Sequence, residues 1–148
     1  MPHDPARVAD TRAWLARAAA DLGAGAHELT AVPPFTADAV FHAQQAVEKV
    51  LKGFLAWHDV PFGKTHDLAV LGRLCAQIDQ GLAAHGQRAA RLTDYAWKYR
   101  YPGEPEEPSR EEAELALALA REVHDAVLGR LPPDVRPASR AATSGDTP

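Results

Sequence analysis

Apolar side chains recur along this chain at steps of three and four residues, which places them on one face of an α-helix. The pattern is clearest over about residues 37–58, where the apolar positions are Val40, Phe41, Val47, Val50, Leu51, Phe54 and Leu55. Similar rows predict a first helix over about residues 5–30, a third that follows Thr65, a fourth over about 82–99 and a fifth that starts at Ser109. Strand patterns are absent from the sequence, so it predicts an all-α protein.

Short polar residues, glycines and prolines set the expected ends of these helices. Thr36 and Thr65 are the expected caps of the second and third helices, because a threonine hydroxyl accepts a hydrogen bond from a free amide of the first turn. Gly23 and Gly25 are expected to fray or bend the second half of the first helix, since glycine costs about 1 kcal/mol relative to alanine in a helix interior. Two prolines at 132–133 end the fifth helix.

The fifth predicted helix carries an apolar row that we expect to face the core, made of Leu115, Ala118, Leu119, Val123, Ala126 and Val127. Helices joined by short connections pack as antiparallel neighbours. The predicted fold is therefore an all-α, antiparallel four- to five-helix bundle formed by residues 1–131. Residues 132–148 are polar and rich in proline, and we predict that they form a disordered C-terminal tail.

Composition and charge narrow the classes of function. The chain has 148 residues and a net charge of −4, which fits one domain and excludes a protein that is basic as a whole. Contact with RNA or DNA would have to come from a local patch. Residues 88–100 form such a stretch, with four basic residues against Asp94, but residues 104–114 follow it with six glutamates.

The sequence also indicates a cytoplasmic protein with no cofactor and no metal site. Its single cysteine, Cys75, excludes an intramolecular disulfide and fits a reducing compartment. The first ten residues lack the apolar core of a signal peptide, and no apolar run approaches the roughly 20 residues that span a bilayer, so we expect no membrane partner. His27-Glu28 lacks the second histidine of a zinc-binding helix motif, and no other histidine has ligand spacing.

A second row on the second predicted helix supplies the first candidate binding residues. His42, Gln45, Lys49 and Lys52 recur at helical spacing and lie at the edge of the apolar face. In a ligand site, the lysines would act as point charges for phosphates, and the amide and imidazole would form hydrogen bonds. The same spacing also fits the solvated flank of an ordinary amphipathic helix.

Three further candidates lie at helix ends. His66, followed by Asp67, either contributes to a ligand site or has a structural role, which would be capping of the third helix or a histidine hydrogen bond to the second helix. Arg100 would hold a phosphate, and Tyr101 would stack on a base or close a dimer interface. The alternative for Arg100 is an ion pair with Glu104 or its acidic neighbours.

Two blocks of residues go beyond a generic helical pattern. The first is residues 41–52 (FHAQQAVEKVLK) with residues 65–68 (THDL), and the second is residues 95–104, which contain Tyr95-Ala96 and the run YRYPGE. In this combination and order they resemble the HEPN domain family, in particular its short prokaryotic branch, over about residues 5–131. The resemblance implies a dimeric bundle of four to five helices that acts with a minimal nucleotidyltransferase, encoded beside it, in a toxin–antitoxin-like system. Other members of the family bind nucleotides, and we hypothesise that nucleotide or RNA contact in this chain occurs through the second and fourth helices.

Many members of that family are metal-independent ribonucleases, whose motif is an arginine followed after four to six residues by a histidine. No arginine in this chain has a histidine at that spacing, and the closest pair, Arg121 and His124, is separated by two residues. The leading hypothesis is therefore a non-catalytic interaction module, and no catalytic residue is assigned. The alternative is a divergent ribonuclease toxin that uses Arg100 with His42 or His66.

Two expectations about assembly and ligand binding follow. The apolar faces of the first, second and fifth helices exceed what a short bundle buries alone, so we expect a homodimer. If the second and fourth helices are neighbours, then Lys49, Lys52 and Arg100 converge on one groove of positive potential. Nucleotide or RNA phosphates would bind in that groove, with Tyr101 against a base.

Overall fold

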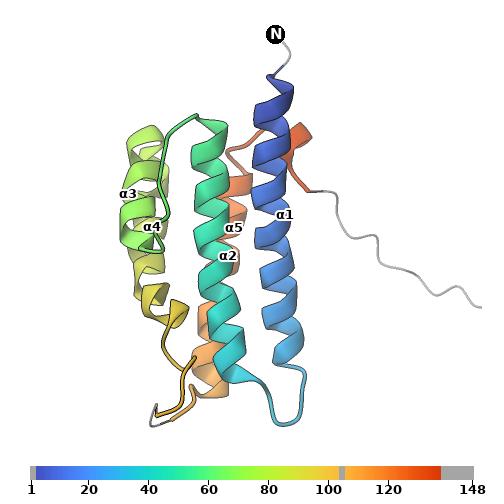
Figure 1. Cartoon of the computed structure of the whole chain (residues 1–148), viewed down its shortest axis with the longest axis vertical. Coiled ribbons are helices and arrows are strands. Elements are labelled where there is room, and N and C mark those ends of the chain that lie inside the picture. The colour runs from blue at the N-terminus through green and yellow to red at the C-terminus, as the bar shows by residue number, and fades with distance from the viewer. Residues whose placement is uncertain (1–2, 104–105, 138–148) are drawn as a thin grey trace, which may run out of the picture.

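The computed structural model describes residues 3–103 and 106–137, and within these ranges it contains helices but no strands. The helices are α1 (Pro5–Glu28), α2 (Thr36–Trp57), α3 (Leu68–Ile78), α4 (Ala83–Ala89) and α5 (Arg110–Leu128), as Figure 1 shows. Three 3₁₀ turns accompany them, η1 (Gln80–Leu82), η2 (Ala90–Ala96) and η3 (Pro133–Val135). The predicted fold class, an all-helical bundle, is confirmed. None of the described helices is long and apolar enough to cross a membrane.

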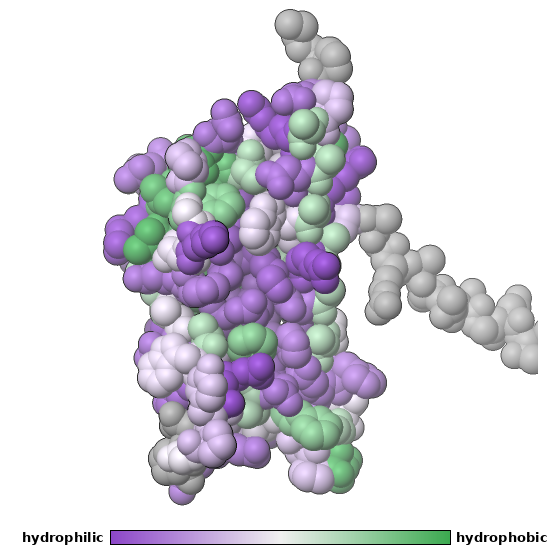
Figure 2. All heavy atoms as spheres, in the orientation of Figure 1, coloured by the Kyte–Doolittle hydropathy of each residue, from purple (hydrophilic) through white to green (hydrophobic). Residues whose placement is uncertain are grey.

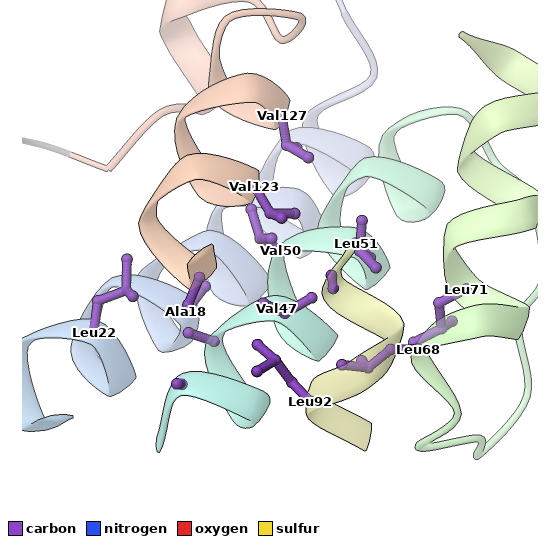
Figure 3. Packing of buried hydrophobic residues seen from close by; sticks show 14 of the residues in the cluster. Ala18, Leu22, Val47, Val50, Leu51, Leu68, Leu71, Leu92, Val123 and Val127 are labelled. Atoms are coloured by element: carbon purple, nitrogen blue, oxygen red, sulfur yellow. The ribbon is translucent and has the colours of Figure 1, made fainter. Parts of the chain in front are cut away.

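The second helix is the centre of the bundle. It forms an antiparallel hairpin with α1, and it also contacts α5, α3 and η2 (Figure 1). Figure 3 shows the resulting core, in which Val47, Val50 and Leu51 of α2 lie among apolar side chains of the other helices, namely Ala18, Leu22, Leu68, Leu71, Leu92, Val123 and Val127. Since α2 is enclosed on several sides, polar residues on its outer face also become buried.

The connection between α2 and α3 returns alongside α2 instead of turning sharply. Residues 58–67 run back along the bundle before α3 begins (Figure 1). Phe62 in this segment packs edge-to-face on Trp14 of α1, with 5.8 Å between ring centroids, which fastens the segment to the α1–α2 hairpin. As a result, His66 lies beside the middle of α2.

Both predicted threonine caps are wrong. The cap of α3 is Asp67, whose carboxylate accepts a hydrogen bond from the Ala69 amide at 2.9 Å. Thr65 instead accepts a hydrogen bond from the Asp67 amide, at 3.1 Å, and so belongs to the turn before the helix. Thr36 is the buried first residue of α2, and Phe35 occupies the cap position without a side-chain hydrogen bond.

The glycines of α1 do not fray it, contrary to the sequence-based expectation. The helix is continuous to Glu28. Gly25 is buried where α1 meets α5, and a Cβ atom at this position would lie 2.6 Å from a methyl group of Leu117. Glycine therefore permits close packing at Gly25, while Gly23 is exposed and open space surrounds it.

The predicted fourth helix is shorter and less regular than expected. Instead of one helix over 82–99, the chain forms α4 and then continues as the 3₁₀ turn η2. The backbone amides of Trp97 and Lys98 both donate to the Asp94 carbonyl, which ends the helical run. Tyr99 then adopts a left-handed backbone conformation, with φ of 66°, and turns the chain toward Arg100.

The fifth helix presents a different apolar row to the core than the sequence predicts. Its buried residues are Ala113, Ala116, Leu117, Ala120, Val123, His124 and Val127. Val123 and Val127 are inward as expected, whereas Leu115 is 64% exposed and Ala118 is also exposed. The helix carries two apolar rows. The row that includes Ala113, Ala116 and Ala120 packs against α1 and α2, because its small side chains allow a close fit.

The packed part of the chain extends beyond the predicted domain boundary at residue 131. Val135 in η3 is fully buried, and the Arg136 guanidinium donates to the Leu131 carbonyl at 2.9 Å. The Arg12 guanidinium of α1 donates to the Asp134 carbonyl at 2.6 Å. The rest of the predicted tail, residues 138–148, lies outside the described residues.

We expect added side-chain volume to have opposite effects at Gly72 and at Gly23. A Cβ atom at Gly72 of α3 would lie 3.1 Å from the Cα atom of Gly86 in α4, so Gly72→Val should force the two helices apart and cost about 1–3 kcal/mol of unfolding free energy. Gly23→Ala is the matched control and should stabilise the protein by about 0.5–1 kcal/mol. Urea denaturation of both variants measures these changes, and stabilisation by Gly72→Val would contradict the close helix contact.

Candidate functional site

Side chains on the outer face of α2 form two clusters together with side chains from neighbouring elements. The amino-terminal cluster consists of Glu28, Asp38, Phe41, His42 and Arg100. The central cluster consists of Gln44, Gln45, Glu48, Lys52 and His66. Both lie on the side of α2 that faces away from the apolar core, between α1 and the segments that follow α2 in sequence. All candidate residues except Lys49 and Tyr101 belong to one of these two clusters.

In the amino-terminal cluster, Arg100 reaches α2 from the end of the η2 region. Its Nη1 atom lies 3.2 Å from Oδ1 of Asp38, and its guanidinium stacks over the Phe41 ring at 3.9 Å from the centroid. His42 lies one helical turn after Asp38, and its Nδ1 atom is 2.7 Å from a carboxylate oxygen of Glu28 on α1. The structure therefore brings Arg100 and His42 to the same end of α2.

In the central cluster, a buried carboxylate holds three side chains. Glu48 is only 4% exposed. Its oxygens lie 2.7 Å from Nδ1 of His66, 3.3 Å from Nζ of Lys52 and 3.3 Å from Nε2 of Gln44. The Gln44 side-chain carbonyl in turn accepts a hydrogen bond from Gln45 at 2.7 Å. Each member of this network thus has a hydrogen-bonding partner, as buried polar groups require.

His66 is oriented by this network but remains open to solvent. Its side chain is 69% exposed, whereas that of Glu48 is 5% exposed. The Glu48 carboxylate accepts a hydrogen bond from Nδ1–H of His66, which in the neutral ring leaves Nε2 as the nitrogen that can accept a hydrogen bond. The hydrogen bond to the second helix, expected as one of two roles for His66, is therefore present.

Lys52 is buried, so it is not part of a solvated flank. Only 5% of the residue is exposed, and its ammonium lies 5.6 Å from the ring centroids of both Trp14 and Phe62. The ring faces and the carboxylate of Glu48 replace water around this charge. Lys49 points to α1 instead, where its Nζ atom lies 2.6 Å from the Asp21 carboxylate.

The cations do not converge on a single groove within one chain. Arg100 contacts Asp38 and Phe41, which precede Lys49 by 11 and 8 residues. A helix rises about 1.5 Å per residue, so the two contacts are separated from Lys49 by roughly 12–17 Å along α2. One phosphate group cannot bind both Lys49 and Arg100 in this arrangement. Tyr101 is 73% exposed beside Arg100, and Glu104, the predicted partner of Arg100, lies outside the described residues.

Each candidate cation is paired with a carboxylate. Lys49 pairs with Asp21, Lys52 with Glu48 and Arg100 with Asp38, and His42 has Glu28 as its neighbour. Sequence distance hides three of these partners, because Asp21 and Glu28 come from α1 and Asp38 is 62 residues from Arg100. Glu48, in contrast, lies one turn before Lys52 on the same helix. A phosphate would have to compete with a carboxylate at every one of these positions.

Sequence analysis missed a groove between α5 and the α4–η2 segment. Its volume is about 710 Å³, and its lining includes Leu92, Tyr95 and the exposed Leu115. The apolar row of α5 that contains Leu115 indicates this groove, but sequence analysis predicts that the same row faces the core. Tyr95 donates a hydrogen bond to Glu112 across this groove. Burial, reinforced by that hydrogen bond, raises the pKa of Tyr95, so the hydroxyl stays protonated at neutral pH.

The ring nitrogens of His124 do not form an accessible binding site. His124 is 9% exposed on α5, and its Nδ1 atom faces Asp125 at 3.4 Å. Across residues 3–103 and 106–137, no group of three or more histidine, cysteine, aspartate or glutamate residues is arranged to hold a metal ion.

Comparison with known proteins gives one match. The family model of the HEPN domain matches residues 11–131, which include α1 from Thr11 onward and all of α2 to α5. No curated protein and no solved structure matches the chain.

Proposed function

We propose a function from the premise that this chain belongs to the HEPN domain family, whose model covers most of its length. The proposal is that the chain is a non-catalytic interaction module. It binds a minimal nucleotidyltransferase encoded beside its gene, and the two act as a toxin–antitoxin-like pair. Protein binding is the main role of the module, and nucleotide or RNA binding is secondary.

One observation carries this proposal, namely the pairing of every candidate cation with a carboxylate. Lys52 and Glu48 are both almost completely buried, so a phosphate cannot reach that lysine without opening the structure. The chain as a whole is acidic, with a net charge of −4. Since nucleic-acid affinity depends on free lysine and arginine charges, this arrangement supports a protein partner over an RNA backbone.

The absence of catalysis is supported by the surroundings of the histidines. The nearest histidine after an arginine in sequence, His124, is buried in α5. His66 is anchored to Glu48, which lies ten residues beyond Asp38 and therefore roughly 15 Å along α2 from the contact of Arg100. His66 and Arg100 cannot act on one phosphate within a single chain.

The partner is tested by co-expression. The chain and the nucleotidyltransferase encoded beside its gene should elute together on size-exclusion chromatography as a complex of fixed stoichiometry. Separate elution of the two proteins, or the lack of such a neighbouring gene, would contradict the proposal.

Nucleotide or RNA binding is tested separately. A labelled oligonucleotide is titrated into the wild type, Lys49→Ala and Arg100→Ala at low and moderate salt. Weak binding that is equal for all three proteins fits the proposed function. A loss of affinity in both variants, with a steep dependence on salt, would show that phosphates displace Asp21 and Asp38.

A second function, a divergent ribonuclease, is favoured by the proximity of Arg100 and His42. General acid–base cleavage of RNA needs a proton acceptor beside a group that stabilises the phosphate. His42, oriented by Glu28, and Arg100 could supply these two roles at the amino-terminal end of α2. Of the two histidines considered for this activity, the proximity to Arg100 favours His42.

We expect the purified protein not to cleave RNA at a measurable rate. Asp38 neutralises Arg100 and would repel the phosphate that the arginine has to stabilise. The measurement is a gel assay of a mixed-sequence RNA in the presence of a chelator. Metal-independent cleavage that is lost in both Arg100→Ala and His42→Ala, but retained in His66→Ala, would make the ribonuclease the better description.

A further inference from the structure

The groove between α5 and the α4–η2 segment has an apolar lining that the bundle does not cover. Leu92 and Ala116 form its deeper part and are almost completely buried, whereas Leu115 beside them is 64% exposed. Leu115 and Leu119 belong to the row of α5 that faces this groove, and the opposite row is buried against the rest of the bundle. Apolar surface that stays exposed beside a groove is a feature of binding sites.

Side-chain contacts close the groove at both ends. Arg88 of α4 pairs with Glu122 at one end, and Tyr95 of η2 donates a hydrogen bond to Glu112 at the other. Glu122 lies ten residues after Glu112 on α5, so a rise of about 1.5 Å per residue gives the groove a length of roughly 15 Å. A helix or an extended peptide along the groove would have to displace both contacts. The space, about 710 Å³, suits a small molecule, since pockets for such ligands have volumes of roughly 300–1,000 Å³.

Arg91 is a charged residue of the lining that has no partner. It lies between Arg88 and Tyr95 in sequence, hence between the two closed ends of the groove, and it is exposed. Within the part of the chain that the structure describes, its guanidinium forms no hydrogen bond or ion pair. Glu111 of the lining forms none either, but it lies in the first turn of α5, where the helix dipole stabilises a carboxylate. Arg91 is therefore the charge that is left to bind a ligand.

The other charges of the lining limit the ligand to a single anionic group. The groove is lined by more carboxylates than cations, namely Glu111, Glu112 and Glu122 against Arg88 and Arg91. Arg88 is already paired with Glu122. A ligand with several negative charges, such as a nucleotide, would meet more carboxylates than free cations there. Most of the remaining lining is apolar, so most of the ligand surface has to be apolar as well.

We infer that this groove binds a small amphipathic acid, in which one carboxylate is attached to an apolar alkyl or aromatic body. The carboxylate pairs with the Arg91 guanidinium, whose planar fork of N–H groups matches two carboxylate oxygens. The apolar body lies over Leu92 and Ala116 and covers Leu115, which removes apolar surface of both molecules from water.

This site goes beyond the proposed function. Its lining shares no residue with the two clusters on α2, and a ligand can bind to the isolated chain without a nucleotidyltransferase or RNA. Binding of a nucleotidyltransferase can therefore fail while binding of the acid holds, or the reverse.

The test is isothermal titration calorimetry of the purified full chain with dodecanoate, a single carboxylate on an alkyl chain. We expect the wild type to bind it at one site per chain. Arg91→Ala should weaken binding by roughly tenfold or more, because a hydrogen-bonded charge pair is lost. Arg17→Ala is the matched control, since Arg17 is an exposed arginine on α1, and this variant should bind like the wild type. Dodecylamine, a cation of the same chain length, should bind roughly tenfold more weakly than dodecanoate or not at all.

A variant that fills the groove locates the binding. Ala118 lines the groove and is exposed, so Ala118→Trp should abolish binding of dodecanoate while thermal unfolding of the free protein stays close to that of the wild type. No binding of dodecanoate, equal binding by Arg91→Ala, or equal binding of dodecylamine would overturn the inference. So would light scattering that shows a wild-type dimer which Ala118→Trp dissociates, because a second copy would then occupy the groove.

Discussion

Replacing Glu48 with alanine should lower the free energy of unfolding by about 3–5 kcal/mol. The replacement leaves the Lys52 ammonium buried between Trp14 and Phe62 without a counter-charge, and it removes the hydrogen-bond acceptor of His66 and Gln44. An uncompensated buried charge is costly because the low-polarity surroundings do not replace the lost solvation. Chemical denaturation followed by circular dichroism gives the change directly.

Two further variants separate charge from packing. The double variant Glu48→Ala/Lys52→Met removes both charges, so it should lose clearly less stability than the sum of the two single replacements. Asp38→Ala breaks the Arg100 ion pair, in which Asp38 is 50% exposed, and it should cost about 1 kcal/mol or less. Equal losses for Glu48→Ala and Asp38→Ala would show that burial of Glu48 does not determine its contribution.

Replacing Phe54 with alanine should cost a similar amount, about 3–5 kcal/mol, for a different reason. Phe54 is 1% exposed and is the largest fully buried side chain of the core. Its truncation removes many apolar contacts and leaves a cavity between helices that cannot collapse completely.

Phe35→Ala removes the same atoms from a side chain that is 58% exposed, so it serves as the matched control. Its effect should stay within about 0.5 kcal/mol. Denaturant titrations of both variants at one protein concentration allow the comparison. A loss below about 1 kcal/mol for Phe54→Ala would mean that the core repacks around the missing ring.

Much of the fold could be predicted from helical periodicity alone, because the apolar rows of α1, α2 and α3 have one dominant direction. The fourth helix was shorter than predicted, and the fifth helix differed in the face that it buries. Its larger residues, Leu115 and Leu119, suggested the inward face, whereas close packing selected the row of small residues that includes Ala116 and Ala120. Periodicity gives the spacing of a row, but it cannot decide between two apolar rows on the same helix.

The candidate site shows a different limit of sequence analysis. The positions of His42, Gln45, Lys49 and Lys52 on one side of α2 follow from their spacing. The electrostatic environment of His42 and Lys49 does not, because it depends on carboxylates of α1, Glu28 and Asp21. The depth of burial of Lys52 depends on the returning segment 58–67, which has no periodic pattern to predict its path.

The contact between η3 and α1 has a consequence for protein engineering. Because Arg12 binds the Asp134 carbonyl, the beginning and the end of the described chain meet at the same end of the bundle (Figure 1). The α1–α2 turn lies at the other end, and it carries the highly exposed Val32. The space-filling view in Figure 2 shows hydrophobic surface near that end. This geometry suits a circular permutation, in which a short linker joins the old termini and new termini open at the α1–α2 turn.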